Sequence, residues 1–73
     1  MSELRKEFGQ RLRRIRRMRD LSQEQLAEKA GITSDFVSTI ERGLASPSFD
    51  TLQQLADVLA VHVSEFFPPP EDK

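Results

Sequence analysis

A short segment near the middle of the chain, residues 33–42, carries side chains that could recognise another molecule through hydrogen bonds. On a helical wheel at about 100° per residue, five of these side chains fill one arc about 140° wide. The apolar Phe36, Val37 and Ile40 lie on a different arc. Short polar groups on one helical face suit contact with base edges in a major groove about 12 Å wide. The five are Ser34, Asp35, Ser38, Thr39 and Arg42, and Thr33 precedes them.

Catalytic chemistry, by contrast, has no candidate constellation. The chain has one His, no Cys and no glycine-rich phosphate loop, so no pairing of a nucleophile with a base can be assembled. The carboxylates Asp50, Asp57 and Glu65 fall on surface positions of helices. A single imidazole, His62, does not make a metal site. We therefore expect a protein that is not an enzyme and that has no metal, no cofactor and no small-molecule effector.

The elements that would hold the polar face are helices. Apolar side chains recur every three or four residues from Leu4 to Met18, which predicts an amphipathic helix over about residues 3–19. A capping box at residues 22–25 begins a second helix of about eight residues, and Gly31 ends it. Thr33 then caps a third helix that ends at Gly43.

The remaining chain continues the helical pattern. The turn Ser46-Pro47-Ser48 begins a fourth helix, which ends near Ala60, and residues 61–67 form a short fifth turn of helix. No run of alternating β-branched residues indicates a strand. The brief turn at residues 31–33 forces the second and third helices to cross steeply, so the sequence predicts an all-α, five-helix domain with a helix-turn-helix at its second and third helices.

Length and composition bound the architecture. Seventy-three residues make one domain at most. We assign residues 1–67 to a DNA-binding domain and the proline-rich residues 68–73 to a flexible tail. The longest apolar run, Val58 to Val61, is too short to cross a bilayer, and no signal-peptide core follows the start. These features predict a cytosolic protein with no membrane partner.

Charge is distributed unevenly along the chain. Residues 1–20 carry a net charge of +5 and the remainder −6, although the whole chain has a pI of only 5.8. The basic first helix raises the local potential and speeds encounter with DNA. Most arginine-rich helix faces are merely solvated, so phosphate contact by Arg13, Lys6 or Arg17 individually is not favoured.

The apolar residues near the C-terminus predict a contact with a second subunit. Phe66 and Phe67 are adjacent, so one helix cannot bury both against the same core, and one ring must point elsewhere. Together with Val61 and Val63 they would form a patch that a second copy covers, the other possibility being a tail folded back over the domain. A homodimer is favoured because one module on one short half-site would struggle to reach the usual affinities of specific binders.

Combined, these motifs resemble the helix-turn-helix domain of phage repressors such as lambda repressor and Cro, the XRE family. The resemblance implies a five-helix repressor-like fold and a transcription regulator that binds a near-palindromic operator in double-stranded DNA as a homodimer. The chain is also similar to the controller proteins of restriction-modification systems. The matching segments are residues 12–16, 21–27, 31–32, 37–38, 40–43 and 47–48, with Leu52.

The resemblance also assigns roles by position. Gln23 would hold a phosphate, a role that its place beside a helix N-terminus favours independently. Arg42 and the loop after it would grip the DNA backbone. Arg16, which borders the apolar stripe of the first helix, would form a structural ion pair with Glu41. The residues that would face bases are Thr33, Ser34, Asp35, Ser38 and Thr39.

Several positions depart from this pattern. Leu44 stands where many relatives have a basic residue, and Asp35 puts a carboxylate on the reading face. Ala60 and His62 replace the usual Gly and Ser, so the start of the fifth helix is expected to lack its usual cap. The low pI and Leu44 motivate an alternative function, a protein-interaction module built on a helix-turn-helix scaffold. A membrane-surface role for the first helix is weaker, because its apolar face is needed for the core.

Overall fold

The protein folds entirely into helices. A computed structural model describes residues 2–69, and no strand occurs among them. The elements are α1 (Ser2–Met18), α2 (Gln23–Ala30), α3 (Ser34–Glu41), α4 (Phe49–Leu59) and one 3₁₀ turn, η1 (Val63–Phe66). The all-α fold class is confirmed, with the fifth helical element present as a 3₁₀ turn. Of the predicted tail, residues 70–73 lie outside the described part.

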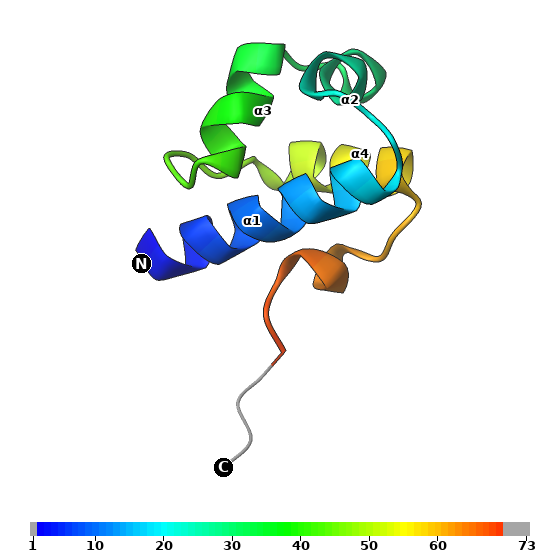
Figure 1. Ribbon diagram of the computed structural model, residues 1–73. Helices are drawn as coiled ribbons and strands as arrows, with labels where there is room; N and C mark the ends of the chain where they lie inside the picture. The colour runs from blue at the N-terminus through cyan, green and yellow to red at the C-terminus, as the bar shows by residue number, and fades with distance from the viewer. Residues whose placement is uncertain (1, 70–73) are drawn as a thin grey trace.

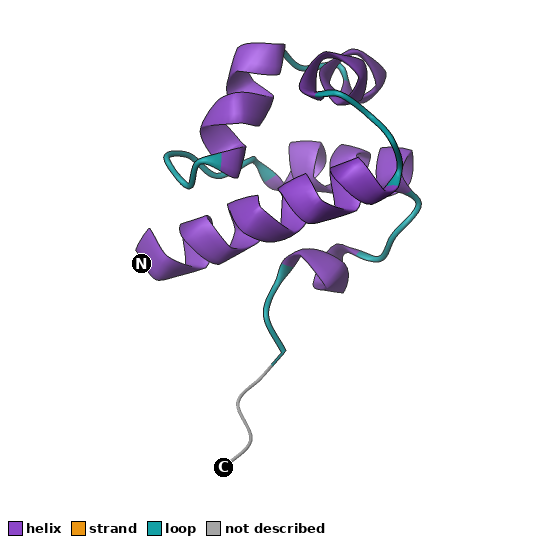
Figure 2. Cartoon of the chain, in the orientation of Figure 1, coloured by secondary structure: helices purple, strands orange, loops and turns teal. Residues whose placement is uncertain are grey.

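The core lies where all five elements meet. As Figure 1 shows, α1 passes between the α2–α3 pair and η1, and Figure 2 shows that loops only connect these helices. Each helix contributes apolar side chains that are almost completely removed from water, and this burial is the main force that stabilises such a domain. The largest of them are Phe66, Leu12, Leu26, Ile40, Leu55, Leu59 and Val37.

Local sequence signals define most helix ends. Ser22 and Gln25 form the reciprocal capping box of α2, and Gly31 closes that helix in the left-handed conformation, at φ 75°. The hydroxyl oxygens of Thr33 and Ser48 accept hydrogen bonds from the third helical N–H of α3 and α4, respectively. The fixed ends of α2 and α3 leave only a short turn between them, so the helices are held at the steep crossing visible in Figure 1.

The fifth element lacks the usual hydroxyl cap, as expected, but another side chain caps it. The Nδ1 atom of His62 accepts a hydrogen bond of 3.2 Å from the backbone N–H of Ser64, so an imidazole takes the place of a hydroxyl. Ala60 likewise takes the place of glycine at the end of α4. It adopts the left-handed conformation, with φ 59° and ψ 44°. Its backbone N–H donates to the carbonyls of Ala56 and Asp57 and so caps the C-terminus of α4.

Replacing Ala60 with glycine is expected to stabilise the protein by about 1 kcal/mol. A left-handed conformation costs a residue with a Cβ about 1–2 kcal/mol, and the greater freedom of unfolded glycine offsets part of that gain. For a domain of this size the melting temperature should rise by about 4–8 °C in a thermal denaturation experiment. Ala45→Gly is the matched control, because Ala45 does not have positive φ. A gain of the same size in the control would contradict this explanation.

One close helix contact has no counterpart in the sequence analysis. Gly9 lies in the middle of α1, where the backbone of α1 approaches the last turn of α3. A Cβ atom at Gly9 would lie 2.7 Å from the carbonyl oxygen of Glu41 and would also clash with that of Ile40. The missing side chain therefore sets how closely α3 sits on α1.

None of the helices in residues 2–69 combines the length and the apolar character that crossing a membrane requires.

Candidate nucleic-acid interface

The polar residues singled out on α3 lie on the side of the helix that faces away from the core. Val37 and Ile40 are fully buried and fix α3 against the core. Asp35, Thr33 and Arg42 are exposed, whereas the serine and threonine side chains between them are half-buried. The structure thus brings the predicted base-facing residues onto one helix whose opposite side is immobilised, and the half-buried members are Ser34, Ser38 and Thr39.

Hydrogen bonds within the domain restrict what this face can offer. The Thr39 hydroxyl donates to the backbone carbonyl of Asp35 at 2.8 Å, so its oxygen remains available as an acceptor. The Thr33 oxygen accepts from the N–H of Phe36 at 3.1 Å, so its hydroxyl proton remains available as a donor. Within residues 2–69 the Asp35 carboxylate has no hydrogen-bonding or ionic partner. The face therefore presents both acceptors and donors, as the major-groove edges of base pairs do.

A buried ion pair holds the end of α3 against α1. The guanidinium of Arg16 donates from Nε to Glu41 Oε2 at 2.6 Å and from Nη2 to Oε1 at 3.0 Å. Its Nη1 donates to the carbonyl of Leu21 at 2.8 Å. Arg16 and Glu41 are only 7% and 6% exposed. No buried polar side-chain atom in the described chain lacks a partner, so this buried charge is compensated.

Gln23 joins the same network at the N-terminus of α2. Its Nε2 donates to Glu41 Oε1 at 3.0 Å, and the side chain is half-buried. This contact leaves the amide oxygen and one N–H of Gln23 free to meet an external group. Sequence reasoning missed the contact, because the two residues are 18 positions apart and no local motif connects them.

Arg42 ends α3 and is exposed. Its backbone N–H donates to the carbonyl of Ser38 at 3.0 Å, while its side chain has no partner in the described chain. Leu44 follows in the same loop and is 63% exposed. The loop after α3 thus offers one cation and one apolar side chain to whatever meets it.

One of the predicted dimer residues has no exposed surface. Phe66 is fully buried, and its ring packs edge-to-face on Phe8 with centroids 5.3 Å apart. The prediction that Phe66 lies in a dimer interface is wrong, since it has no area left for a partner. The ring of Phe67 also contacts Phe8, with centroids 5.5 Å apart and the ring planes tilted by 41°, because η1 ends at Phe66. Val61, Val63 and Phe67 remain half-buried.

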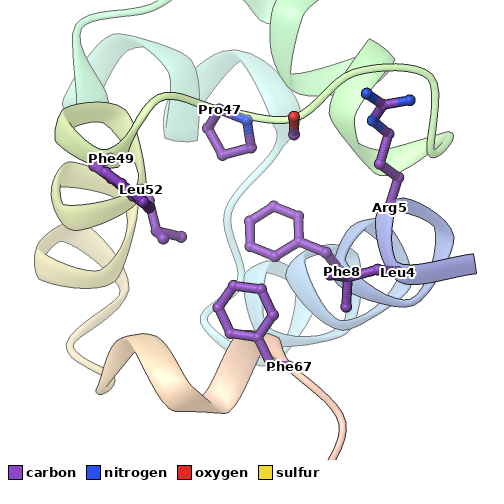
Figure 3. Close-up of a pocket in the computed structure, with 8 residues that line it drawn as sticks. Leu4, Arg5, Phe8, Pro47, Phe49, Leu52 and Phe67 are labelled. Atoms are coloured by element: carbon purple, nitrogen blue, oxygen red, sulfur yellow. The ribbon is translucent and has the colours of Figure 1, made fainter. Parts of the chain in front are cut away.

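An apolar groove of about 420 Å³ opens beside Phe67. Figure 3 shows the rings of Phe8 and Phe67 inside it, between the start of α1 and the start of α4. Two of its lining residues are unusually exposed for their type, namely Leu4 at 52% and Phe49 at 89%. This face therefore has apolar surface available for a partner.

Comparison with known proteins identifies the domain. A helix-turn-helix family model, HTH_3, matches residues 12–66. The chain is 46% identical over 63 residues to the HTH-type transcriptional regulator PuuR of Escherichia coli (strain K12). That alignment covers 86% of this chain and 34% of PuuR, so the chain spans about a third of that relative.

Solved structures show the same fold. The restriction-modification controller protein C.AhdI from Aeromonas hydrophila superposes with a TM-score of 0.83 at 38% identity, covering 86% of this chain and 96% of C.AhdI. The biofilm master regulator SinR, crystallised in complex with DNA, gives 0.77 at 38% identity and covers 81% of this chain and 95% of SinR. These relatives are regulators and not enzymes. The chain belongs to the HTH_3, or XRE-type, helix-turn-helix family.

Proposed function

We propose that this domain regulates transcription by binding double-stranded DNA with α3 in the major groove. The observation that carries the proposal is the outward face of α3. It presents free donors and acceptors on a helix whose other side is fixed by buried Val37 and Ile40 and by the Arg16–Glu41 ion pair. A rigidly positioned helix is what sequence reading requires, because a good side-chain contact with a base discriminates by about 1–3 kcal/mol only in the right geometry.

The proposed roles follow from the hydrogen-bonding state of each side chain. Thr39 accepts from an exocyclic amine of adenine or cytosine, and Asp35 accepts from cytosine N4. Ser34 and Ser38 bond to either edge of a base pair, and Thr33 donates to the DNA. Gln23 and Arg42 hold phosphates at the two ends of the unit, the first beside the N-terminus of α2 and the second after α3.

The proposed assembly is a homodimer on a near-palindromic operator. Val61, Val63 and Phe67 form its interface together with the apolar groove beside Phe67. A two-fold dimer places two copies of α3 about one helical turn of DNA apart, roughly 34 Å, so the two half-sites should repeat at that distance. Size-exclusion chromatography with light scattering, on the wild type and on Phe67→Ser, tests the interface.

In vitro selection of duplexes from a random pool tests the function itself. The proposal expects an enriched inverted repeat. The logarithm of the binding constant for this repeat should fall linearly with the logarithm of the salt concentration, because each neutralised phosphate releases counterions. A pool with no enriched sequence at low salt would instead favour a protein-interaction module. The exposed Phe49 and the groove beside it are the observation that supports that second candidate.

Two substitutions on the selected operator should have different signatures. Thr39→Val removes an acceptor and is expected to relax preference at one base pair of each half-site by about 1–3 kcal/mol. Arg42→Ala removes a phosphate contact and should weaken binding to all sequences alike, with a smaller salt dependence. Repeating the selection and salt titration with each variant checks both. Gln54→Ala, an exposed change on α4, is the control; if it matched either variant, α3 would not be the reader.

A further inference from the structure

Three arginines lie close together on the exposed side of α1. Arg13, Arg14 and Arg17, called here the arginine patch, line a shallow open hollow together with Gln10 and Met18. No acidic residue lines this hollow. Within residues 2–69, Arg14 and Arg17 form no ion pair, and the Arg13 side chain is 54% exposed. The patch therefore carries two arginines without an ion pair beside a third, Arg13, whose nearest carboxylate is the buried Glu41, shared with Arg16.

The charges of the arginine patch repel one another along α1. Arg13 and Arg17 are four positions apart on one helix, where like charges repel one another and destabilise the helix. All three side chains are exposed, and neighbouring Met18 is 67% exposed. The charge is thus available to attract an anion from outside the molecule.

The position of the patch points to which anion. The Nε of Arg13 lies 3.9 Å from Glu41 Oε1, the same oxygen that accepts from Gln23 Nε2 at 3.0 Å. The Arg13 and Gln23 nitrogens are therefore at most 6.9 Å apart, the sum of these distances. Gln23 is the residue proposed to hold a phosphate, so Arg13 can reach the same phosphate or its neighbour.

The helix geometry extends this contact in one direction. Gly9 faces the end of α3, and Lys6 lies against Gly43 in the loop after α3. Arg17 is about 6 Å further along α1 than Arg13, on the same side and away from that loop. A DNA strand held at Gln23 and Arg13 would meet Arg17 next.

We propose that the arginine patch binds the DNA backbone flanking the base pairs that α3 contacts. This inference rests on the proposed function. Guanidinium groups suit the role, because they hold phosphate oxygens through parallel N–H bonds and cannot lose their charge. One phosphate contact contributes about 0.9 to the slope of log K against log salt, which is about an eightfold change in affinity between 1 M and 0.1 M salt.

The test is Arg17→Gln against Arg11→Gln, measured by fluorescence anisotropy on the enriched duplex. Both variants lose one charge from α1, but Arg11 lies about 120° around the helix from Arg17 and beside Glu65. Arg17→Gln should bind about eightfold more weakly at 0.1 M salt for each flanking phosphate that it no longer holds. Its slope of log K against log salt should be smaller in magnitude by about one. Arg11→Gln should match the wild type, and both should keep its melting temperature.

Duplex length provides a second readout. Trimming the duplex to the selected base pairs should weaken the wild type but not Arg17→Gln, because the flanking phosphates are then absent. Equal binding of the long duplex by Arg17→Gln and Arg11→Gln overturns the inference. So does an Arg17→Gln variant that binds phosphatidylserine vesicles more weakly than the wild type but binds DNA equally well. If no sequence is enriched, the proposed function fails. The same comparison on random duplex at low salt then still decides whether the patch binds phosphate.

Discussion

Replacing Glu41 with alanine is expected to lower the free energy of unfolding by about 3–5 kcal/mol. The variant leaves the Arg16 guanidinium 7% exposed with no carboxylate to compensate it. It also removes the acceptor of Gln23 and the charge nearest to Arg13. A domain of this length has only about 4–11 kcal/mol of total stability, so the loss is a large part of the whole.

Urea denaturation followed by circular dichroism measures this loss directly. Glu28→Ala is the control, since Glu28 is an exposed glutamate in a helix, and it should change stability by less than about 0.5 kcal/mol. The double variant Arg16→Met/Glu41→Leu should recover most of the stability, because a buried pair replaced by apolar side chains leaves no orphaned charge. A single variant as stable as the control would mean that water, and not Glu41, compensates Arg16.

Elements whose ends are encoded locally were predicted from the sequence. The capping box at Ser22 and Gln25, the left-handed Gly31, the cap at Thr33 and the turn that ends at Ser48 fix the bounds of three helices. Each of these signals acts within about four residues, so no knowledge of the tertiary structure is needed to read it.

The Arg16–Glu41 ion pair, which the family resemblance implies, is present, but most other features that depend on contacts distant in sequence were not predicted. Phe66 and Phe67 were expected to diverge because a regular helix would separate them, but η1 ends at Phe66 and both rings reach Phe8. On the candidate site, the helical wheel places the α3 side chains on one face. It does not reveal that Thr39 donates its proton to Asp35, or that Glu41 positions Gln23.

Gly9→Ala is the clearest test of a contact that the sequence conceals. By helix propensity alone, alanine in the middle of α1 would stabilise the protein by about 0.8–1.0 kcal/mol. The added Cβ, however, would meet the carbonyl oxygens of Ile40 and Glu41, which belong to the backbone of α3 and have no rotamer to change. Overpacking costs about 1–3 kcal/mol, and occasionally more, even where side chains can adjust. We therefore expect a net loss of about 2 kcal/mol.

Thermal unfolding and operator binding together check this prediction. The melting temperature of Gly9→Ala should fall by about 8–16 °C. Gln10→Ala is the matched control on the next residue, which is exposed, and it should be neutral or slightly stabilising. The folded fraction of Gly9→Ala should also bind its operator more weakly, because α1 and α3 must separate and the end of α3 then shifts relative to Gln23. A variant more stable than the wild type would show that α3 is not held against α1 at Gly9, and that the reading helix is positioned by its apolar face alone.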